Sequence, residues 1–258
     1  MVSVLLVSPR QDAAVAAAEY RDVIRATGLS TEELTQRMLD GPESRIGDLA
    51  GFDGVIVGGS ALNVTNARYD AWQLQVHAEL SWLARQQIPT LAVCYGTTFL
   101  AHATGGEVGH SHPEASGPTV VELTAAGRVD PLTRGLPERF TSLTGHTENV
   151  TAVGPGAVVL ATGPTCPVQM VRFNGSTWAC QFHADMDAAA MKARMDFYFD
   201  YGYFSPEDYD GIVAHLPSVD TTWSNQLLRT FVLRCATGEL RGGRTTDSIL
   251  SPPVVPIG

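Results

Sequence analysis

The chain has no excess of basic residues. Its 258 residues include 17 Lys and Arg against 27 Asp and Glu, which gives a formal net charge of −10 at pH 7. A surface of this sign repels nucleic-acid backbones and anionic membranes. We therefore expect neither a nucleic acid nor a membrane among its partners.

Cysteine is scarce, and the few cysteines are scattered. No C-x-x-C pair occurs, and no histidines stand near the cysteines at the spacing of a zinc site. A disulfide scaffold and a structural metal site are therefore not indicated. The thiols are those expected of a cytosolic protein: Cys94, Cys166, Cys180 and Cys235.

Long apolar runs and phosphate-binding loops are absent too. No hydrophobic stretch approaches the ~20 residues that a membrane helix needs, and the N-terminal segment MVSVLLVSPRQD lacks the basic leader and cleavage site of a secretory signal. Neither a G-x-x-x-x-G-K-S/T motif nor a G-x-G-x-x-G motif after a strand occurs. The sequence thus predicts a soluble, cytoplasmic protein without a nucleotide site or a cofactor.

Strand-like and helix-like segments alternate along the first part of the chain. Short apolar runs typical of buried strands alternate with longer stretches whose apolar residues recur at helical spacing. Such alternation predicts an α/β fold with an open, mostly parallel, flavodoxin-like sheet flanked by helices. The expected strands are 2–8, 54–57 and 90–93, and the expected helices are 13–28 and 69–87.

The pattern changes from about Gly105. Short β-like pieces lie at 119–123 and 156–162, and two more flank Asn174-Gly175, a pair typical of a type I′ hairpin turn. The second half is therefore expected to add antiparallel strands to the sheet.

The last part of the chain shows helical patterns again, at 187–201, 206–215 and 222–235. One domain is expected over 1–236, including a helical extension at about 203–236, and a flexible tail over 237–258. We expect the apolar positions of the extension to pack on the core, or else on a second subunit of a homo-oligomer. These positions are Ile212, Val213, Leu216, Trp223, Leu227, Leu228, Phe231 and Val232.

Cys94 stands where a buried strand meets a helix. In the segment IPTLAVCYGTTFL the strand runs straight into Cys94, and Tyr95-Gly96 open the helix. This is the strand, sharp turn and helix of a hydrolase nucleophile elbow. A thiol there lies at the carboxyl end of the sheet, and the helix N-terminus favours its reactive thiolate form. Cys94 is therefore a candidate nucleophile, although a buried structural cysteine fits the local pattern equally well.

His183 and Asp185 follow a later strand, in the segment WACQFHADMD. A cysteine nucleophile needs a base within hydrogen-bond reach, and that base needs a third group to fix its tautomer. His183 comes 89 residues after Cys94 (183 − 94). The order of a cysteine after one strand and His-x-acid after a later strand predicts a triad of Cys94, His183 and Asp185.

A Gly-Gly pair follows the expected strand 54–57, in the segment VIVGGSALNV. Gly58 and Gly59 free the backbone to bring N–H groups close to a substrate carbonyl. The pair is a candidate half of an oxyanion hole, and a plain structural turn is the commoner use of such a pair.

The three segments VGGS, CYG and QFHAD, in this order within an α/β pattern, resemble the class I glutamine amidotransferases. More narrowly, they are similar to stand-alone relatives of the glutaminase half of GMP synthase. The resemblance covers roughly residues 2–200. It implies that Cys94 is the nucleophile and His183 its base, with Asp185 in the place of the glutamate that orients the histidine.

The resemblance also implies how substrate is held. An oxyanion hole is expected from the backbone N–H groups of Gly59 and Tyr95. The segment TGHTENV is similar to the family's S-H-x-D-x-V loop, so His146 and Glu148 are candidates to line the pocket, with a polar surface loop as an equal alternative. The remaining substrate-binding candidates lie in the other two motifs: Gly58, Ser60, Gly96 and Thr98.

Departures from the family pattern concern the substrate. The family commonly continues C-x-G-H-Q, with a glutamine that contacts the substrate, whereas this chain has Thr97-Thr98. Asp185 is one methylene shorter than the family's glutamate, and Ala184 replaces a proline. The triad chemistry survives these changes, but the identity of the substrate is left open.

Three functions stay open for such a chain. The first is glutamine hydrolysis through a γ-glutamyl thioester, with ammonia passed to a synthetase partner subunit, because the residues after 200 are too few for a synthetase domain. The second is hydrolysis of a γ-glutamyl peptide or amine by the same triad, which the threonine at Thr98 favours. The third is a relative that binds a metabolite or a partner without catalysis, in which Cys94 is unreactive.

Overall fold

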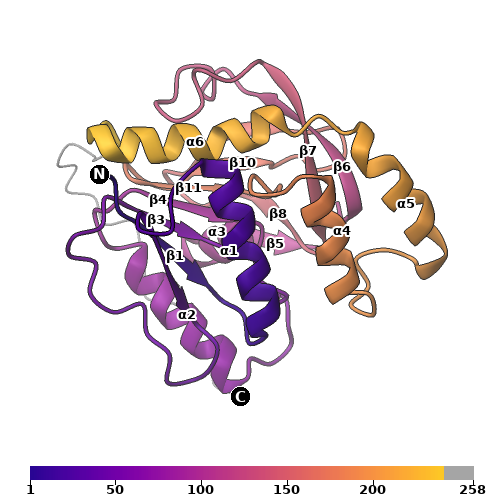
Figure 1. Ribbon diagram of the computed structural model, residues 1–258, viewed down its shortest axis with the longest axis horizontal. Coiled ribbons are helices and arrows are strands. Elements are labelled where there is room, and N and C mark those ends of the chain that lie inside the picture. Colours follow the sequence, from indigo (N-terminus) through magenta and orange to yellow (C-terminus); the bar gives the residue numbers. More distant parts are fainter. Residues whose placement is uncertain (241–258) are drawn as a thin grey trace.

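The computed structural model of the protein describes residues 1–240. A nine-stranded sheet runs through it in the order β2-β1-β3-β4-β11-β10-β9-β6-β7 (Figure 1). The first five strands of this order are mutually parallel: β2 (Leu34–Met38), β1 (Val4–Ser8), β3 (Gly54–Val57), β4 (Thr90–Val93) and β11 (Thr177–Cys180). The other four pair antiparallel: β10 (Met170–Arg172), β9 (Val158–Thr162), β6 (Glu114–Leu123) and β7 (Arg139–His146). The prediction of a mostly parallel sheet that gains antiparallel strands in its second half is confirmed.

Helices flank the sheet, and a small second sheet pairs β5 (Glu107–Gly109) with β8 (Asn149–Ala152). Helix α1 starts at Asp12, whose carboxylate accepts the N–H groups of Ala14 and Val15, and it ends at Gly28 with φ 78°. The helices are α1 (Ala13–Thr27), α2 (Ala71–Leu83), α3 (Tyr95–Ala103), α4 (Ala188–Phe197), α5 (Tyr209–His215) and α6 (Thr222–Thr237), with short 3₁₀ turns η1 (Pro206–Asp208) and η2 (Leu216–Ser218).

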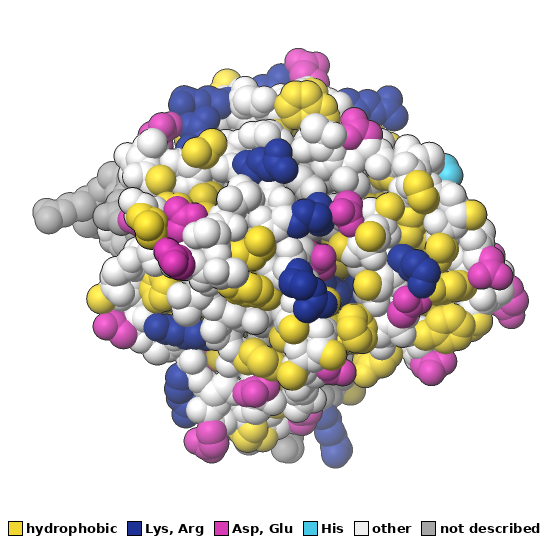
Figure 2. Space-filling view, in the orientation of Figure 1, with side chains coloured by type: hydrophobic (Ala, Val, Ile, Leu, Met, Phe, Trp, Pro, Cys, Tyr) yellow, Lys and Arg dark blue, Asp and Glu magenta, His cyan; other side chains and the backbone are white. Residues whose placement is uncertain are grey.

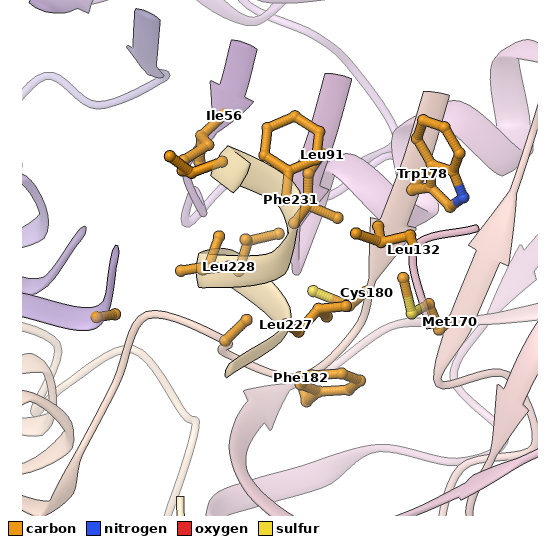
Figure 3. Packing of buried hydrophobic residues seen from close by; sticks show 14 of the residues in the cluster. Ile56, Leu91, Leu132, Met170, Trp178, Cys180, Phe182, Leu227, Leu228 and Phe231 are labelled. Carbon is orange, nitrogen blue, oxygen red and sulfur yellow. The ribbon is translucent and has the colours of Figure 1, made fainter. Parts of the chain in front are cut away.

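Both faces of the parallel strands are buried, because alternate residues enter two separate cores. In β1, Val4 and Leu6 join the core beneath α1 and α6, while Leu5 and Val7 join the core beneath α2 and α3. Figure 3 shows the first of these cores, where Phe231 and Leu228 of α6 lie over the sheet. The sheet is thereby held rigid beneath the ends of its strands, where the candidate site residues lie.

The helical extension packs on the chain's own core for most of its apolar positions. The structure buries Leu216, Leu227, Leu228, Phe231 and Val232. Ile212 and Val213 are half-buried, whereas Trp223 is 39% exposed, so Trp223 does not pack fully on the core and its packing on a second subunit stays a prediction. Of the predicted tail, residues 241–258 lie outside the described part of the chain.

Strand β2 was not predicted from the sequence, because its residues LTQRM are mostly polar. It lies at one edge of the sheet and pairs only with β1, so a single residue of it, Leu34, is fully buried. An edge strand needs no apolar run, because one of its sides is open. The strands β5, β7 and β8 were also not predicted.

The turn between β10 and β11 is not the predicted type I′ turn. The predicted antiparallel pairing is present, but a type I′ turn needs positive φ at both central residues. Neither Asn174 nor Gly175 has positive φ. The loop is longer instead: Phe173 N–H donates to Thr177 O at 2.9 Å, and the Asn174 side chain accepts the Ser176 N–H at 2.8 Å.

The surface carries charges of both signs. Figure 2 shows acidic and basic side chains interspersed over one face of the molecule. Within residues 1–240, no helix combines the length and the apolar composition that a membrane crossing requires.

Candidate active site

The turn between β4 and α3 holds Cys94 in a strained conformation. Its backbone has φ 54° and ψ −101°, and it is the only non-glycine residue among residues 1–240 with positive φ. Strain of this kind costs about 1–3 kcal/mol and persists where the surrounding structure enforces it. Here Cys94 N–H donates to Cys180 O at 2.7 Å, and a Cβ on Gly96 would lie 2.5 Å from the Ala92 Cβ, so α3 packs tightly on β4. The strand, turn and helix expected around Cys94 are present.

His183 reaches Cys94 because β11 pairs in parallel with β4. The register sets Cys180 beside Val93, so the chain leaves both strands at the same edge of the sheet. Just beyond that edge, His183 N–H donates to Leu143 O at 2.8 Å. Its Nδ1 lies 3.3 Å from Asp185 Oδ1, and both side chains are buried. The structure thus brings together the three residues of the predicted triad.

The electrostatics of the triad favour a charged histidine. Burial alone would lower the pKa of His183, but the hydrogen bond with Asp185 and the neighbouring Cys94 sulfur outweigh it and raise that pKa to about 9. Burial would likewise raise the pKa of Asp185, but the hydrogen bond and charge of His183 lower it to about 2. At neutral pH, His183 is therefore held as a proton donor beside Cys94.

Two backbone N–H groups beside Cys94 are free to donate. The N–H of Gly58 is used by Val7 O at 2.9 Å, whereas neither Gly59 N–H nor Tyr95 N–H has a hydrogen-bond partner within residues 1–240. Gly59 lies against the site, since a Cβ there would be 3.8 Å from the Cys94 Cβ. Free donors in such a position suit a developing oxyanion.

Two pockets meet at Cys94. The α3 pocket has about 230 Å³ of empty space and is lined in part by Thr98 of α3, His146 and Glu148. The α4 pocket has about 420 Å³ of empty space, part of it open to solvent, and is lined in part by His183 and Arg194. Both pockets share Ser60, Cys94, Gly145 and Tyr203.

The candidate substrate residues of the α3 pocket are largely engaged with one another. Thr98 Oγ1 donates to Glu148 Oε1 at 2.7 Å. Glu148 also accepts the N–H groups of Val64 and Thr65, each at 3.1 Å. His146 Nε2 lies 2.9 Å from a carboxylate oxygen of Glu114, and its Nδ1 is buried without a partner in the described chain.

Three further predicted residues have structural contacts of their own. Ser60 lines both pockets, and its hydroxyl donates to Pro9 O at 2.8 Å. Gly58 and Gly96 line neither pocket. A side chain on Gly58 would clash with the buried Glu19 carboxylate, so this glycine provides space for a neighbour instead.

Sequence reasoning missed a charged group beside the triad. Arg10 and Glu19 form a buried ion pair at 2.8 Å, and Arg10 Nη1 donates to Tyr198 OH at 2.6 Å. A signal for the pair existed. Arg10 follows β1 at the same edge of the sheet as Cys94, and Glu19 is a lone charge on the apolar face of α1. Arg194 and Tyr203 carry no such signal, because they lie in segments without a motif.

One cluster in the described chain offers side chains that bind metals. Ligand atoms of Glu114, His146 and Cys166 lie within 4.8 Å of one another. Burial would raise the pKa of Glu114, but hydrogen bonds from His146, Thr165 and Thr119 lower it to about 2. Because these donors already stabilise the carboxylate, we assign no metal to the cluster.

The sequence matches a family profile over the region that builds this site. The profile of glutamine amidotransferase class-I matches residues 21–199. The chain belongs to this family. The expected resemblance to the class I glutamine amidotransferases is thereby confirmed.

Similar proteins agree with this membership. A GMP synthase (glutamine-hydrolyzing) from Thermomicrobium roseum is 36% identical over 114 residues, which is 44% of this chain and 20% of that protein. Another from Aeropyrum pernix is 32% identical over 163 residues, which is 63% of this chain and 29% of that protein. The chain therefore spans less than a third of the length of these curated relatives.

Solved structures share the amidotransferase fold. A glutamine amidotransferase from Thermotoga maritima has a TM-score of 0.73 at 18% identity, with 91% of this chain and 98% of that chain covered. A protein from Thermoplasma acidophilum, described as one subunit of a GMP synthase, has a TM-score of 0.63 at 20% identity, with 93% and 96% covered. At these identities the likeness extends to the fold alone.

Proposed function

We propose that the protein hydrolyses a γ-glutamyl amide, with Cys94 as nucleophile, His183 as acid and base, and Asp185 as the residue that orients the histidine. One observation carries the proposal. Cys94 occupies a strained elbow at the carboxyl end of β4, beside a histidine that is itself bound to an aspartate. Membership in the class-I family supports it.

The reaction proceeds in two steps. The Cys94 thiolate attacks the amide carbon, the oxyanion accepts hydrogen bonds from the N–H groups of Gly59 and Tyr95, and His183 protonates the departing nitrogen. Water then attacks the γ-glutamyl thioester while His183 accepts its proton. Each oxyanion donor is worth roughly 2.7–4 kcal/mol, and general acid–base catalysis contributes about 10²–10⁴-fold.

A second candidate differs in the fate of the nitrogen. The relatives named GMP synthase hydrolyse glutamine, and one structural neighbour is described as a separate subunit of such a synthase. By analogy, the protein would release ammonia to a synthetase partner subunit. Glutaminase activity that rises only when such a subunit is added would favour this candidate over hydrolysis without a partner.

The test is covalent labelling with 6-diazo-5-oxo-L-norleucine, a glutamine analogue with an electrophilic carbon, followed by intact-mass and peptide analysis. One adduct per chain is expected, on Cys94. Cys166 and Cys180 are poor competitors, because burial raises the pKa of Cys166 to about 11 and raises that of Cys180 further, and Cys235 is buried.

The matched controls are Cys94→Ala, which should take up no label, and His183→Ala, which should react much more slowly. A wild-type protein that stays unlabelled, although iodoacetamide still modifies Cys94, would contradict the proposal and favour a non-catalytic binding role.

A further inference from the structure

The position of His183 decides which part of a substrate each pocket receives. Among the residues that line the two pockets, His183 belongs to the α4 pocket and not to the α3 pocket. In amide cleavage, the base that takes the proton of the nucleophile delivers it to the leaving nitrogen. The leaving amine therefore enters the α4 pocket, and the acyl part of the substrate lies in the α3 pocket.

Arg194 is a buried cation on the wall of the α4 pocket. The residue is 7% exposed, and its Nη2 has no hydrogen-bond partner within residues 1–240. Its ion pair with Asp22 is long, at 3.6 Å. Arg194 thus has one long ion pair and no hydrogen bond at Nη2, so an anion in this pocket would add to the stabilisation of its charge.

The other charged groups around this pocket already have partners. Arg10 is paired with Glu19 at 2.8 Å, and His183 is bound to Asp185. Among the described residues that line the α4 pocket, Arg194 is thus the one whose side chain has a buried donor without a hydrogen bond.

The rest of the α4 pocket is largely apolar. Helix α4 lies beside α1 (Figure 1). The pocket receives Met191 and Met195 from α4 and Phe204 from the segment after it. Methionine and phenylalanine walls suit an apolar side chain, and methionine adapts to its shape.

We propose that the α4 pocket binds a leaving group that combines an apolar side chain with a carboxylate, so that the substrate is a γ-glutamyl peptide ending in an apolar amino acid. The proposal rests on the function proposed above for Cys94. It assigns the carboxylate to Arg194 and the side chain to the wall formed by Met191, Met195 and Phe204.

The chemistry balances without a co-reactant other than water. The C–N bond of the γ-glutamyl amide breaks as the C–S bond to Cys94 forms, and the proton of His183 goes to the departing amino group. Water then forms a C–O bond as the C–S bond breaks, and its proton returns to His183. The products are glutamate and the free apolar amino acid.

The first test compares substrates on the wild-type protein. We compare γ-glutamyl-leucine with γ-glutamyl-isoamylamide, which has the same side chain but no carboxylate, and with glutamine. The expected kcat/KM for γ-glutamyl-leucine is about 10- to 100-fold above that for the isoamylamide, the range of one hydrogen bond to a charged group. A ratio below threefold overturns the proposal.

The second test uses Arg194→Met, which keeps the apolar stem and removes the charge. It should lower kcat/KM for γ-glutamyl-leucine about 10-fold or more beyond any loss on the isoamylamide, so that the ratio between the two substrates falls toward one, and Arg194→Lys should retain part of the advantage. Arg139→Met, an exposed arginine at the start of β7, is the matched control and should retain all of it. Equal losses on both substrates would mean a structural role and overturn the proposal.

The failures of the two proposals are distinguishable. If 6-diazo-5-oxo-L-norleucine labels Cys94 and an amide is hydrolysed without a carboxylate advantage, only the leaving-group proposal fails. If no γ-glutamyl compound reacts and Cys94 takes up no label, the proposed function fails, and the leaving-group proposal fails with it.

Discussion

Gly59 has little room for a side chain in the candidate site. A Cβ at this position would lie 3.2 Å from both Arg10 Nη2 and His183 Cε1. Its backbone φ is not positive, so alanine is compatible with the local backbone conformation. The added methyl group would instead crowd the side chains of Arg10 and His183. The histidine therefore has to shift, or the N–H group of Gly59 has to move away from the proposed oxyanion position.

We expect Gly59→Ala to lower kcat/KM at least about 10-fold while changing the free energy of unfolding by less than about 1 kcal/mol, since misplacing one oxyanion donor costs up to 10²–10³-fold. Gly211→Ala in α5 is the matched control, because a Cβ there meets nothing within 4 Å. Steady-state kinetics and urea unfolding provide the comparison. Wild-type kinetics in Gly59→Ala would remove Gly59 from the site.

Asp185 raises the pKa of His183 through its hydrogen bond and its charge. Asp185→Asn removes the carboxylate charge that raises the pKa of His183, whereas the lowering effect of burial remains. The pKa of His183 should therefore fall from about 9. NMR titration of the imidazole Cε1–H measures the shift, and Asp196→Asn, an exposed change on α4, should leave it in place. An unchanged His183 pKa in Asp185→Asn would argue against Asp185 as its partner.

Among the elements, helix α6 fastens the core on one face of the sheet (Figure 3). Leu228 is fully buried there, whereas Leu233 on the same helix is 62% exposed. We expect Leu228→Ala to destabilise the protein by about 2–5 kcal/mol, because it removes buried methyl groups and leaves a cavity. Leu233→Ala should change the free energy of unfolding by no more than about 0.5 kcal/mol. Urea unfolding followed by circular dichroism measures both, and similar losses would contradict the packing described for α6.

The elements differ in how far the sequence could predict them. Strands β3 and β4 are buried on both faces, so their sequences are apolar runs. The predicted bounds of both strands agree with the structure at every residue. The polar edge strand β2 has no such signal. Cys94 and His183 were found because each follows a strand in a short motif. Arg194 was not found, because its place in the α4 pocket comes from tertiary packing that no local pattern encodes.

For the whole molecule, stability should depend on pH through Asp22. Burial and the charge of Asp185 raise the pKa of Asp22 to about 7, against the lowering effect of Arg194. The unfolded chain ionises this group near its ordinary value of about 3.9. Between these values the folded state binds more protons, so stability is highest below pH 4 for this group and is lost as the pH rises through 7.

Asp22→Asn tests this dependence. From pH 4.5 to 6.5 the wild type should lose about 1–2 kcal/mol more than the variant, an amount already reduced for partial access of water. Asp185 and Glu114, with pKa values of about 2, act in the opposite sense and below this window. Exposed Asp200→Asn should follow the wild type in urea titrations at each pH. Parallel pH curves for wild type and Asp22→Asn would contradict the assignment.

The pairing of β4 with β11 also has a consequence for biosynthesis. Cys94 leaves the ribosome 89 residues before His183 (183 − 94), an interval on the order of ten seconds at ordinary translation rates. Until β11 is made, one edge of β4 has no strand beside it, and β4 ends at the proposed nucleophile, Cys94. A nascent chain thus carries an apolar open edge that neighbours on the same polysome can pair with, and its thiol gains its histidine only when β11 docks.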